Sequence, residues 1–489
     1  MTRDYVCFYL NGTERKLGAE QAKMMLSDYL RYDQALTGTK VVCAEGDCGA
    51  CSVLRYFPHT QTNPKENHQF TAINSCITPV ASLDGASLIT VDALKNEEEL
   101  HETQRAMMEN HGSQCGFCTP GFVIALAGLT EKKIEQNEKE ITEADAKNAL
   151  TGNLCRCTGY QAIIDSAKDI DLSKTEHLYK RFYNKDQAKV LAGAFNSEVK
   201  IASDDYLFYA PKTIEEACQF LNDHPQAKIL ASSTDLGVVH NKRRLKLNEI
   251  LSLHLISDLY QMKVDEKHVT FGARVNFSDF RNVIKDIIPE FADYIDVFAS
   301  PQIKNLATLV GNVCTASPIG DSPPPLLALE SIIHLQSVEG KRSVPMAEFF
   351  LDYRKTSRKP NELVTAISFP KPSKHSTLRF YKNANRKDLD ISAVNLAVKV
   401  DWQDKKNGII EKAVIAAGGI AATTLRLKET EKKLAGQKID SQLLDQVCTE
   451  VQNEFTPLSD LRASANYRRL VVENLLRRSF YEMNGEALA

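Results

Sequence analysis

The sequence has no excess of charge of either sign, with 60 Lys and Arg against 63 Asp and Glu and a formal net charge of -3 over 489 residues. A chain that binds nucleic acid through bulk positive charge is therefore excluded. Because 43% of the residues are hydrophobic and 25% charged, a disordered chain and a collagen-like polymer are excluded too. A globular chain of this length suits about two to four domains.

Long hydrophobic runs are also missing. The first residues alternate toward a strand and break at Asn11-Gly12, which leaves no apolar segment of signal-peptide length. The longest apolar run near any motif, 122–129, is far too short to cross a bilayer. We therefore expect a cytoplasmic protein with no membrane and no nucleic-acid partner. In a reducing cytosol, clustered cysteines are more often metal ligands or redox groups than disulfides.

The sequence contains neither G-x-G-x-x-G nor G-x-x-x-x-G-K-[ST], so neither a Rossmann fingerprint nor a P-loop is predicted. Cysteine, in contrast, is concentrated at one end of the chain. Nine of the 12 cysteines lie within the first 160 residues, and eight of these nine fall into two spaced groups. The remaining four are interpreted as structural thiols without a partner pattern: Cys7, Cys218, Cys314 and Cys448.

The first cysteine group has three members in a nine-residue loop and a fourth that follows after 24 residues: Cys43, Cys48, Cys51 and Cys76. This C-x4-C-x2-C…C spacing is the plant-type ferredoxin pattern that holds a 2Fe-2S cluster. Gly46 and Gly49 allow the loop to wrap around a bulky cluster, because glycine adopts positive φ without steric cost. Zinc sites usually present two C-x2-C pairs, so zinc is the weaker interpretation here.

The second cysteine group consists of two pairs with 36 residues between them: Cys115, Cys118, Cys155 and Cys157. Pro120 is placed to begin a helix that continues over 122–129, so the first pair lies where the helix dipole favours thiolate charge. The second pair, two residues apart, cannot share a helix face and requires a loop. On spacing alone a four-cysteine zinc site is an equal alternative, and a thioredoxin-like dithiol is less favoured because no strand precedes it.

Together the two patterns resemble the iron–sulfur half of the molybdenum hydroxylases, a family that includes xanthine dehydrogenase, aldehyde oxidase and carbon monoxide dehydrogenase. In that family the first four cysteines hold one 2Fe-2S cluster in a ferredoxin-like sheet, and the second four hold another in a helical bundle. Carried over residue by residue, all eight ligands are present in this chain. The resemblance thus implies iron–sulfur clusters at both groups, where spacing left the second group open.

Two later segments are rich in small polar residues. In 228–237 three hydroxyl residues and Asp235 follow a predicted strand, where they could hold a pyrophosphate. If this segment is considered alone, a turn after the strand with an N-cap for the next helix is the simpler interpretation. The segment 307–321 is weak evidence by itself. Both segments resemble the flavin-binding domain of the same family. This chain departs from the family pattern at Ser232 and Val310, where the family usually has glycine. The Cβ atoms of these two residues limit how closely the backbone can approach a phosphate.

By that resemblance the first segment lines the FAD pyrophosphate, through Leu230, Ala231, Ser232, Ser233, Thr234, Asp235 and Leu236. The second segment contacts the rest of the cofactor, through Thr308, Gly311, Asn312, Thr315, Gly320 and Asp321. Lys382 matches a lysine that lies close to the flavin. Asp388 and Asp390 fall near where a nicotinamide would dock, and a solvated charged turn is an equally good interpretation of them.

The predicted fold class is a multidomain α+β chain. Its expected parts are a ferredoxin-like β-grasp domain (1–90), a helical 2Fe-2S bundle (91–172), a linker (173–200), an α+β FAD-binding domain (201–372) and an α+β flavoprotein C-terminal domain (377–485). Apolar spacing predicts one helix over 20–31 in the first part. The charged stretch 131–143 predicts a solvated connection or exposed face.

The resemblance is to the iron–sulfur and FAD small subunit of bacterial xanthine dehydrogenases, since this chain ends where a fused relative would continue into a molybdopterin part. It implies an oxidoreductase subunit that passes electrons from a molybdenum-cofactor large subunit, which oxidises hypoxanthine and xanthine, through two 2Fe-2S clusters to FAD and NAD+. A heterotetramer of two small and two large chains is expected. No proton-transfer residue is expected in this chain, because the cofactors carry the redox chemistry.

Three alternatives remain at this point. One is the equivalent subunit of an enzyme for an aldehyde or another N-heterocycle. Another is a stand-alone flavo-iron–sulfur electron carrier, and the third is a zinc-stabilised interaction module, which metal content would distinguish.

Overall fold

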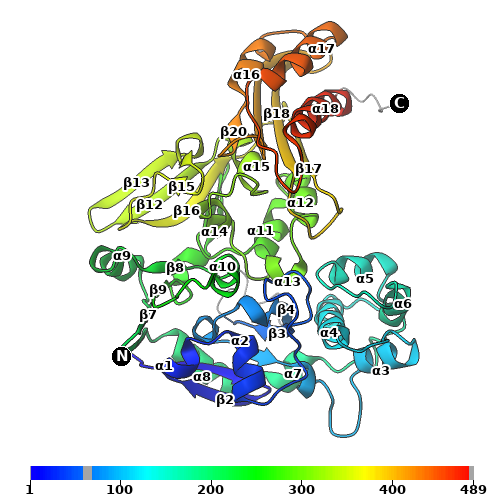
Figure 1. Cartoon of the computed structure of the whole chain (residues 1–489), viewed down its shortest axis with the longest axis vertical. Helices are drawn as coiled ribbons and strands as arrows, with labels where there is room; N and C mark the ends of the chain where they lie inside the picture. Colours follow the sequence, from blue (N-terminus) through cyan, green and yellow to red (C-terminus); the bar gives the residue numbers. More distant parts are fainter. Residues whose placement is uncertain (1, 59–68, 484–489) are drawn as a thin grey trace. The chain divides into compact units, whose positions relative to one another are not determined.

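The computed structural model describes residues 2–58 and 69–483, which divide into two compact units. The first unit contains Met1–Tyr260 and Ser300–Thr308, and the second contains Gln261–Ala299 and Leu309–Ala489. The division falls inside the stretch 201–372 that the sequence assigns to a single FAD-binding domain. Each unit is mixed α and β, and the predicted multidomain α+β class is confirmed (Figure 1).

The first sheet of the first unit has the strand order β2-β1-β5-β3-β4. Its strands are β1 (Val6–Leu10), β2 (Thr13–Leu17), β3 (Ser52–Tyr56), β4 (Thr71–Asn74) and β5 (Ser87–Ile89). Asn11 and Gly12 both have positive φ, as a tight hairpin turn requires, and β1 pairs parallel with β5. This is the expected small sheet around a helical segment, with the fully buried Phe8 and Tyr29 in edge-to-face contact.

The helical segment of this sheet differs from the prediction. Instead of one helix over 20–31, the chain forms α1 (Ala19–Ala22), α2 (Leu26–Asp28) and a π-helical turn (Tyr29–Asp33). The break occurs because the backbone there pairs with a distant segment: the amide of Leu26 donates to the carbonyl of Thr78, and the amide of Val80 donates to the carbonyl of Met24. Tertiary hydrogen bonds thus override a local helical pattern.

Four helices follow the first sheet: α3 (Glu102–Glu109), α4 (Thr119–Glu135), α5 (Glu143–Leu150) and α6 (Gln161–Lys168). The helix expected over 122–129 is therefore confirmed as part of α4. The stretch 131–143 is only partly a solvated connection, because α4 extends into it and fully buries Glu131. The Glu131 carboxylate accepts the amides of Leu178 (2.7 Å) and Tyr179 (3.1 Å).

The stretch 173–200, expected as a linker, contains α7 (Leu178–Phe182) and α8 (Lys185–Phe195). A second sheet of order β6-β7-β9-β8 follows. Its strands are β6 (Val199–Ser203), β7 (Tyr206–Ala210), β8 (Lys228–Leu230) and β9 (Glu249–Ser252), with helices α9 (Ile214–Asp223) and α10 (Leu236–Arg243) between them. Helix α13 (Pro301–Lys304) returns to this unit and packs against β4.

The second unit contains a five-stranded sheet, a four-stranded sheet and a two-stranded hairpin. The first has the order β10-β11-β16-β12-β13, from β10 (Met262–Val264), β11 (His268–Gly272), β12 (Ile332–Ser337), β13 (Gly340–Pro345) and β16 (Leu363–Pro370). The unit also contains the helices α11 (Phe277–Ile284), α12 (Pro289–Asp296), α14 (Leu309–Cys314) and α15 (Pro323–Ala328), of which α14 contacts β16 of this sheet. The strands β14 (Phe350–Asp352) and β15 (Lys355–Thr356) form a separate hairpin.

The second sheet of this unit has the order β17-β18-β19-β20. It is built from β17 (Ser376–Asn383), β18 (Val394–Asp404), β19 (Ile409–Gly418) and β20 (Leu425–Arg426). Helices α16 (Lys428–Leu434), α17 (Ser441–Glu450) and α18 (Ala465–Met483) pack with it, and α18 lies along β17 and β18 (Figure 1).

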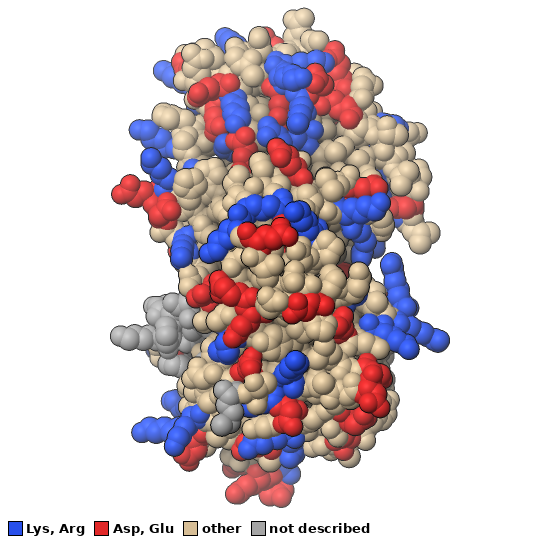
Figure 2. Space-filling model, turned by 90° about the vertical axis from the view of Figure 1, so that its left-hand side faces the viewer, with Lys and Arg blue, Asp and Glu red and all other residues tan. Residues whose placement is uncertain are grey.

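The surface mixes both signs of charge. On the face drawn in Figure 2, Lys and Arg lie interspersed with Asp and Glu, as the near-balanced composition requires. Within residues 2–58 and 69–483, no helix combines the length and apolarity needed to span a bilayer.

Glu131 should make the stability of the first unit depend on pH. Burial raises the pKa of this carboxyl to about 8 from 4.5, against the opposing effect of backbone hydrogen bonds from Leu178, Tyr179 and Phe70. Between about pH 4.5 and pH 8 the folded chain therefore keeps a proton that the unfolded chain has released. The free energy of unfolding should fall as the pH rises through this window, by up to about 1.4 kcal/mol per pH unit.

The substitution Glu131→Gln should flatten that pH dependence, because it removes the titrating group and keeps its size. Melting temperatures followed by circular dichroism between pH 5 and pH 8 test this. The exposed Glu140→Gln serves as the control and should retain the slope of the unsubstituted chain. Equal slopes for all three proteins would contradict the assignment to Glu131.

Candidate functional site

The first cysteine group converges in the first unit. Cys43, Cys48 and Cys51 lie in the loop before β3, and Cys76 lies in the 3₁₀ turn η2 (Ser75–Ile77) that follows β4. Cys51 and Cys76 are each only 2% exposed, whereas Cys43 and Cys48 are half-buried. Hydrogen bonds from the Cys48 and Cys76 thiols lower the pKa of Cys43, and a hydrogen bond from Cys76 lowers that of Cys51.

The loop around these thiols is shaped by its backbone. Gly46 and Gly49 have φ of +77° and +68°, as the wrapping loop was expected to require. The Asn74 side-chain amide donates to the Gly46 carbonyl (2.5 Å), and the Ser75 hydroxyl donates to the Cys51 carbonyl (2.7 Å). The donor set and the loop therefore fit a 2Fe-2S cluster, whose ligands are thiolates.

The second cysteine group also converges. Cys118 is the N-cap of α4, and Cys155 and Cys157 lie in the loop before α6, as predicted. The side chains of Cys115 and Cys157 are hydrogen-bonded, and so are those of Cys118 and Cys155. Burial followed by the Cys155 contact raises the pKa of Cys118 to about 12, so burial outweighs the expected dipole effect. The Thr158 hydroxyl donates to the Cys155 sulfur (3.3 Å).

Within each thiol group the cysteine side chains contact one another. Within residues 2–58 and 69–483, no three His, Cys, Asp or Glu side chains are grouped so as to hold a single metal ion. A 2Fe-2S cluster takes four thiolate ligands on its two irons, and each group supplies four cysteines. No disulfide is formed by the cysteines of this described part of the chain.

Sequence spacing did not reveal that the two groups lie next to each other. The amide of Leu154, beside Cys155, donates to the carbonyl of Cys48 (3.0 Å). The Asn153 side chain donates to the Gly49 carbonyl (3.3 Å), and Gln302 of α13 donates to Asn153 (2.8 Å). A Cβ added at Gly49 would lie closer than 3.0 Å to the Gly152 carbonyl oxygen. The loops of the two groups are therefore in direct backbone contact.

The first predicted FAD segment connects β8 to α10 in the same unit. Ser233, with φ of +73°, is 4% exposed, and its hydroxyl donates to the carbonyl of Ile77 (2.7 Å) next to Cys76. Leu230 is also buried (1% exposed). The other predicted residues of this segment are half-buried and remain able to face a ligand: Ala231, Ser232, Thr234, Asp235 and Leu236.

The remaining predicted FAD residues are divided between the units. Thr308, at 2% exposure, belongs to the first unit. Gly311, Asn312 and Thr315 lie in or directly after α14 of the second unit, where Asn312 accepts a hydrogen bond from the Ser322 hydroxyl (2.6 Å). Neither Ser232 nor Val310 has positive φ, and Val310 is buried within α14. These two positions therefore do not require the backbone conformation that favours glycine.

A buried polar cluster in the second unit contains two of the predicted flavin residues. The Lys382 ammonium and the Asp321 carboxylate form an ion pair at 2.7 Å, and their side chains are 3% and 7% exposed. The Asp321 carboxylate also accepts hydrogen bonds from the Ser392 hydroxyl (2.5 Å), the Asn395 amide (3.0 Å) and the Tyr294 hydroxyl (3.3 Å). The Gly320 carbonyl accepts a second hydrogen bond from Asn395. Asp321 is thereby fixed in position before any ligand binds.

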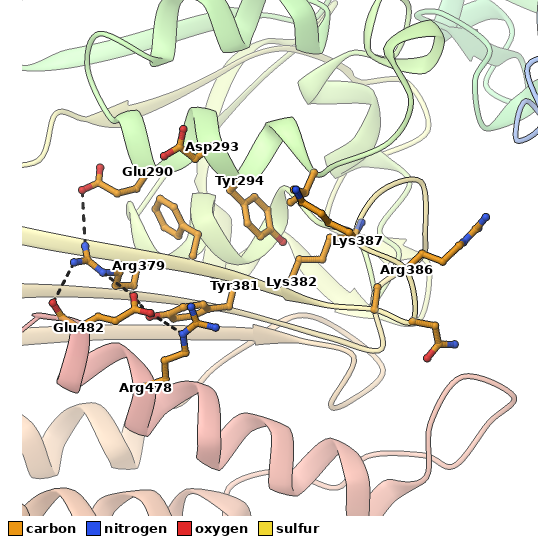
Figure 3. A pocket seen from close by; sticks show the side chains of 14 residues that line it. Glu290, Asp293, Tyr294, Arg379, Tyr381, Lys382, Arg386, Lys387, Arg478 and Glu482 are labelled. Carbon is orange, nitrogen blue, oxygen red and sulfur yellow. Dashed lines mark hydrogen bonds and ion pairs between the residues drawn. The ribbon is translucent and has the colours of Figure 1, made fainter. Parts of the chain in front are cut away.

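A pocket of about 550 Å³ lies beside this cluster, between α12, β17, the loop after β17 and α18 (Figure 3). Arg379 and Arg478, which line it, form ion pairs with Glu482 (3.2 Å and 2.6 Å). The complete lining is Glu290, Asp293, Tyr294, Val297, Arg379, Phe380, Tyr381, Lys382, Ala384, Asn385, Arg386, Lys387, Arg478 and Glu482. Sequence reasoning missed this pocket, because its residues come from separate stretches of chain.

Of the two aspartates expected near a nicotinamide, Asp390 has a structural role. Its carboxylate accepts the amides of Arg386 (3.1 Å) and Ile391 (2.9 Å), which closes the turn after β17. Burial opposes ionisation, but these hydrogen bonds lower the pKa of Asp390 overall. This geometry corresponds to the charged-turn interpretation, while Arg386 and Lys387 of the same loop line the pocket.

Two cysteine clusters and a candidate flavin site define an iron–sulfur flavoprotein, and four known domain families match it in order. "2Fe-2S iron-sulfur cluster binding domain" matches 8–81, and "[2Fe-2S] binding domain" matches 90–168. "FAD binding domain in molybdopterin dehydrogenase" matches 193–372, and "CO dehydrogenase flavoprotein C-terminal domain" matches 379–483.

Whole-chain comparisons agree with these domains. The chain is 30% identical to xanthine dehydrogenase of Drosophila subobscura and 28% identical to xanthine dehydrogenase 1 of Arabidopsis thaliana, over 98% and 92% of its length. It spans 39% and 38% of these relatives. A reconstituted CO dehydrogenase structure from Oligotropha carboxidovorans matches 58% of this chain and 99% of its own, with a TM-score of 0.54 and 26% identity. The chain belongs to the molybdenum hydroxylase family and carries its iron–sulfur and FAD domains.

The contact at Gly49 should be intolerant of any side chain. The substitution Gly49→Ala places a Cβ against the Gly152 carbonyl at a φ of +68°, so we expect a loss of at least about 2 kcal/mol of folding free energy. Thermal unfolding followed by circular dichroism measures this. The control is Gly193→Ala within α8, where a Cβ meets nothing within 4 Å and should stabilise the helix by about 1 kcal/mol. Equal melting temperatures for both variants would contradict the close contact.

Proposed function

We propose that this chain is the electron-transfer subunit of a xanthine dehydrogenase. A molybdenum-cofactor subunit would oxidise hypoxanthine or xanthine, and electrons would pass through two 2Fe-2S clusters to FAD and then to NAD+. The observation that carries the proposal is the gradient of exposure within the first unit. Cys115 and Cys157 are exposed, whereas Cys51 and Cys76 are buried beside the predicted flavin segment. This order supports a path in which the exposed thiol group receives electrons from a partner and the buried one passes them to the flavin.

The residues of the chain hold and shield these groups. The first cluster would be held by Cys43, Cys48, Cys51 and Cys76, and the second by Cys115, Cys118, Cys155 and Cys157. When bound, the clusters and FAD accept and release electrons, which protein side chains cannot do. The flavin would contact 230–236, Thr308, Gly311, Asn312, Thr315, Gly320, Asp321 and Lys382. No side chain is assigned a proton-transfer role.

The pocket beside Lys382 is proposed as the docking site of NAD+. Lys382 lines the pocket and also pairs with Asp321, so the pocket adjoins the predicted flavin residues. Arg386 and Lys387 are exposed at this loop, and cations there suit a pyrophosphate.

Assembly and compartment belong to the same proposal. We propose a heterotetramer of two such chains with two molybdenum-cofactor chains, located in the cytoplasm, where thiolate ligands stay reduced. A subunit for an aldehyde or another heterocycle is the second candidate, and 28% identity to aldehyde oxidase 1 of Bos taurus favours it. Co-purification with a molybdopterin chain, followed by assays with xanthine and with aldehydes, would separate the two.

Cofactor content tests the proposal directly. Purified protein should contain about four irons, about four acid-labile sulfides and about one FAD per chain. Cys51→Ala and Cys118→Ala should each leave about two irons, because each removes a ligand of a different cluster. The buried Cys218→Ala, in the same unit, is the control and should keep all four. Zinc without sulfide in the unsubstituted chain would contradict the proposal.

The nicotinamide step can be tested without a partner subunit. Lys387→Ala should raise the KM for NADH about tenfold in a dye-reduction assay, because it removes a charge-assisted hydrogen bond. Reduction by dithionite should stay unchanged. The exposed Lys374→Ala is the matched control. An unchanged KM for Lys387→Ala would exclude the pocket as the nicotinamide site.

A further inference from the structure

Helix α10 joins two parts of the candidate site in the first unit. Its beginning, Leu236, completes the predicted flavin segment, and Asn241 lies near its end. The Asn241 side-chain nitrogen lies 2.9 Å from the carbonyl oxygen of Ala44 and 2.8 Å from that of Cys76. One half-buried amide group therefore donates to both carbonyls. Nothing in the cysteine spacing or in the flavin motif pointed to this residue.

The two carbonyls belong to the two separate stretches of chain that carry the first cysteine group. Ala44 follows Cys43 in the loop that holds three of the thiols, and Cys76 is the fourth ligand residue. The side chains of Asn74 and Ser75 also hydrogen-bond to the cysteine loop, and these two residues belong to the ferredoxin-like part itself. Asn241 instead reaches them from the flavin segment. It therefore links the two halves of the thiol group to each other and to α10.

The peptide that Asn241 holds also contacts a sulfur. The carbonyl of Ala44 and the amide of Glu45 belong to the same planar peptide group. The Glu45 amide hydrogen-bonds with the Cys43 sulfur. Fixing the Ala44 carbonyl fixes the orientation of that amide. Hydrogen bonds to the sulfurs are among the factors that set the potential of a 2Fe-2S cluster.

The rest of α10 is seated against the same region. The Ser233 hydroxyl donates to the carbonyl of Ile77, and a Cβ atom added at Gly237 would lie closer than 3.0 Å to that carbonyl oxygen. Val238 packs against the small apolar cluster of Cys51, Cys76 and Ile77. The helix thus lies directly on the buried half of the first thiol group, and Asn241 supplies its two directional bonds.

We propose that Asn241 is a positioning residue that holds the first iron–sulfur loop against the flavin segment and orients a backbone donor toward the Cys43 sulfur. This inference rests on the proposed function, since it concerns the cluster that these thiols hold. Loss of the Asn241 amide should weaken the donor to Cys43. Because such donors stabilise the more negative, reduced cluster, the potential of the first cluster should become more negative.

Redox titration followed by electron paramagnetic resonance tests this on the full chain. Asn241→Leu removes both hydrogen bonds at similar size, and the smaller Asn241→Ser serves if the leucine variant does not fold. Both should shift the first cluster to a more negative potential and leave the second unchanged. Asn241→Gln, which keeps the amide, should recover part of the shift.

The matched control is Lys242→Met, which removes the surface ion pair of the next residue with Glu45 (3.3 Å) and leaves the Asn241 bonds intact. It should not shift the first cluster. An unchanged first-cluster potential in Asn241→Leu or Asn241→Ser, or an equal shift in Lys242→Met, would overturn the role of Asn241. Absence of both clusters from the unsubstituted chain would instead overturn the proposed function, so the two failures are distinguishable.

Discussion

The first unit depends on backbone contacts around Gly49 that leave no space for a side chain. A Cβ at Gly49 would meet the Gly152 carbonyl, and a Cβ at Gly121, in the first turn of α4, would meet the Gly49 carbonyl. The amide of Leu154 then donates to Cys48. Three stretches of chain that carry or flank cysteines are thus joined main chain to main chain. Since backbone positions do not change with side-chain rotamers, the spacing between the two thiol groups is fixed by the fold itself.

Each unit also contains a buried ion pair that fixes the position of the segments it joins. In the first unit the Arg3 guanidinium makes two 2.7 Å hydrogen bonds to the fully buried Asp84 and another to the Ala194 carbonyl. Burial opposes ionisation, but the Arg3 contact lowers the pKa of Asp84 overall. In the second unit Asp321 has Lys382 as its partner. Such pairs contribute little net stability because desolvation offsets attraction, but breaking one leaves a costly unpaired charge, so they fix the position of the segments they join.

Local sequence patterns predicted some of the helices and strands, such as the first hairpin turn and the helix over 122–129, because apolar periodicity and turn residues act over a few residues. They failed where distant segments intervene. The helix expected over 20–31 is broken because Met24 and Leu26 pair with the backbone near Thr78. Glu131, expected in a solvated stretch, is buried because α7 presents backbone amides to it. The pocket beside Lys382 was not predicted, since α12, β17 and α18 lie in three widely separated stretches of the chain.

The sequence by itself determined the chemistry of this protein: eight cysteines in two spacings, the resemblance to a molybdenum hydroxylase, and the candidate flavin residues. These are local features, since spacing and residue type are written along the chain. Only the tertiary structure decided that the two thiol groups adjoin, that the second is more exposed than the first, and that Asn241 bridges Ala44 and Cys76. These depend on contacts across up to about two hundred residues, which no local pattern encodes because hydrogen bonds and close packing act through space.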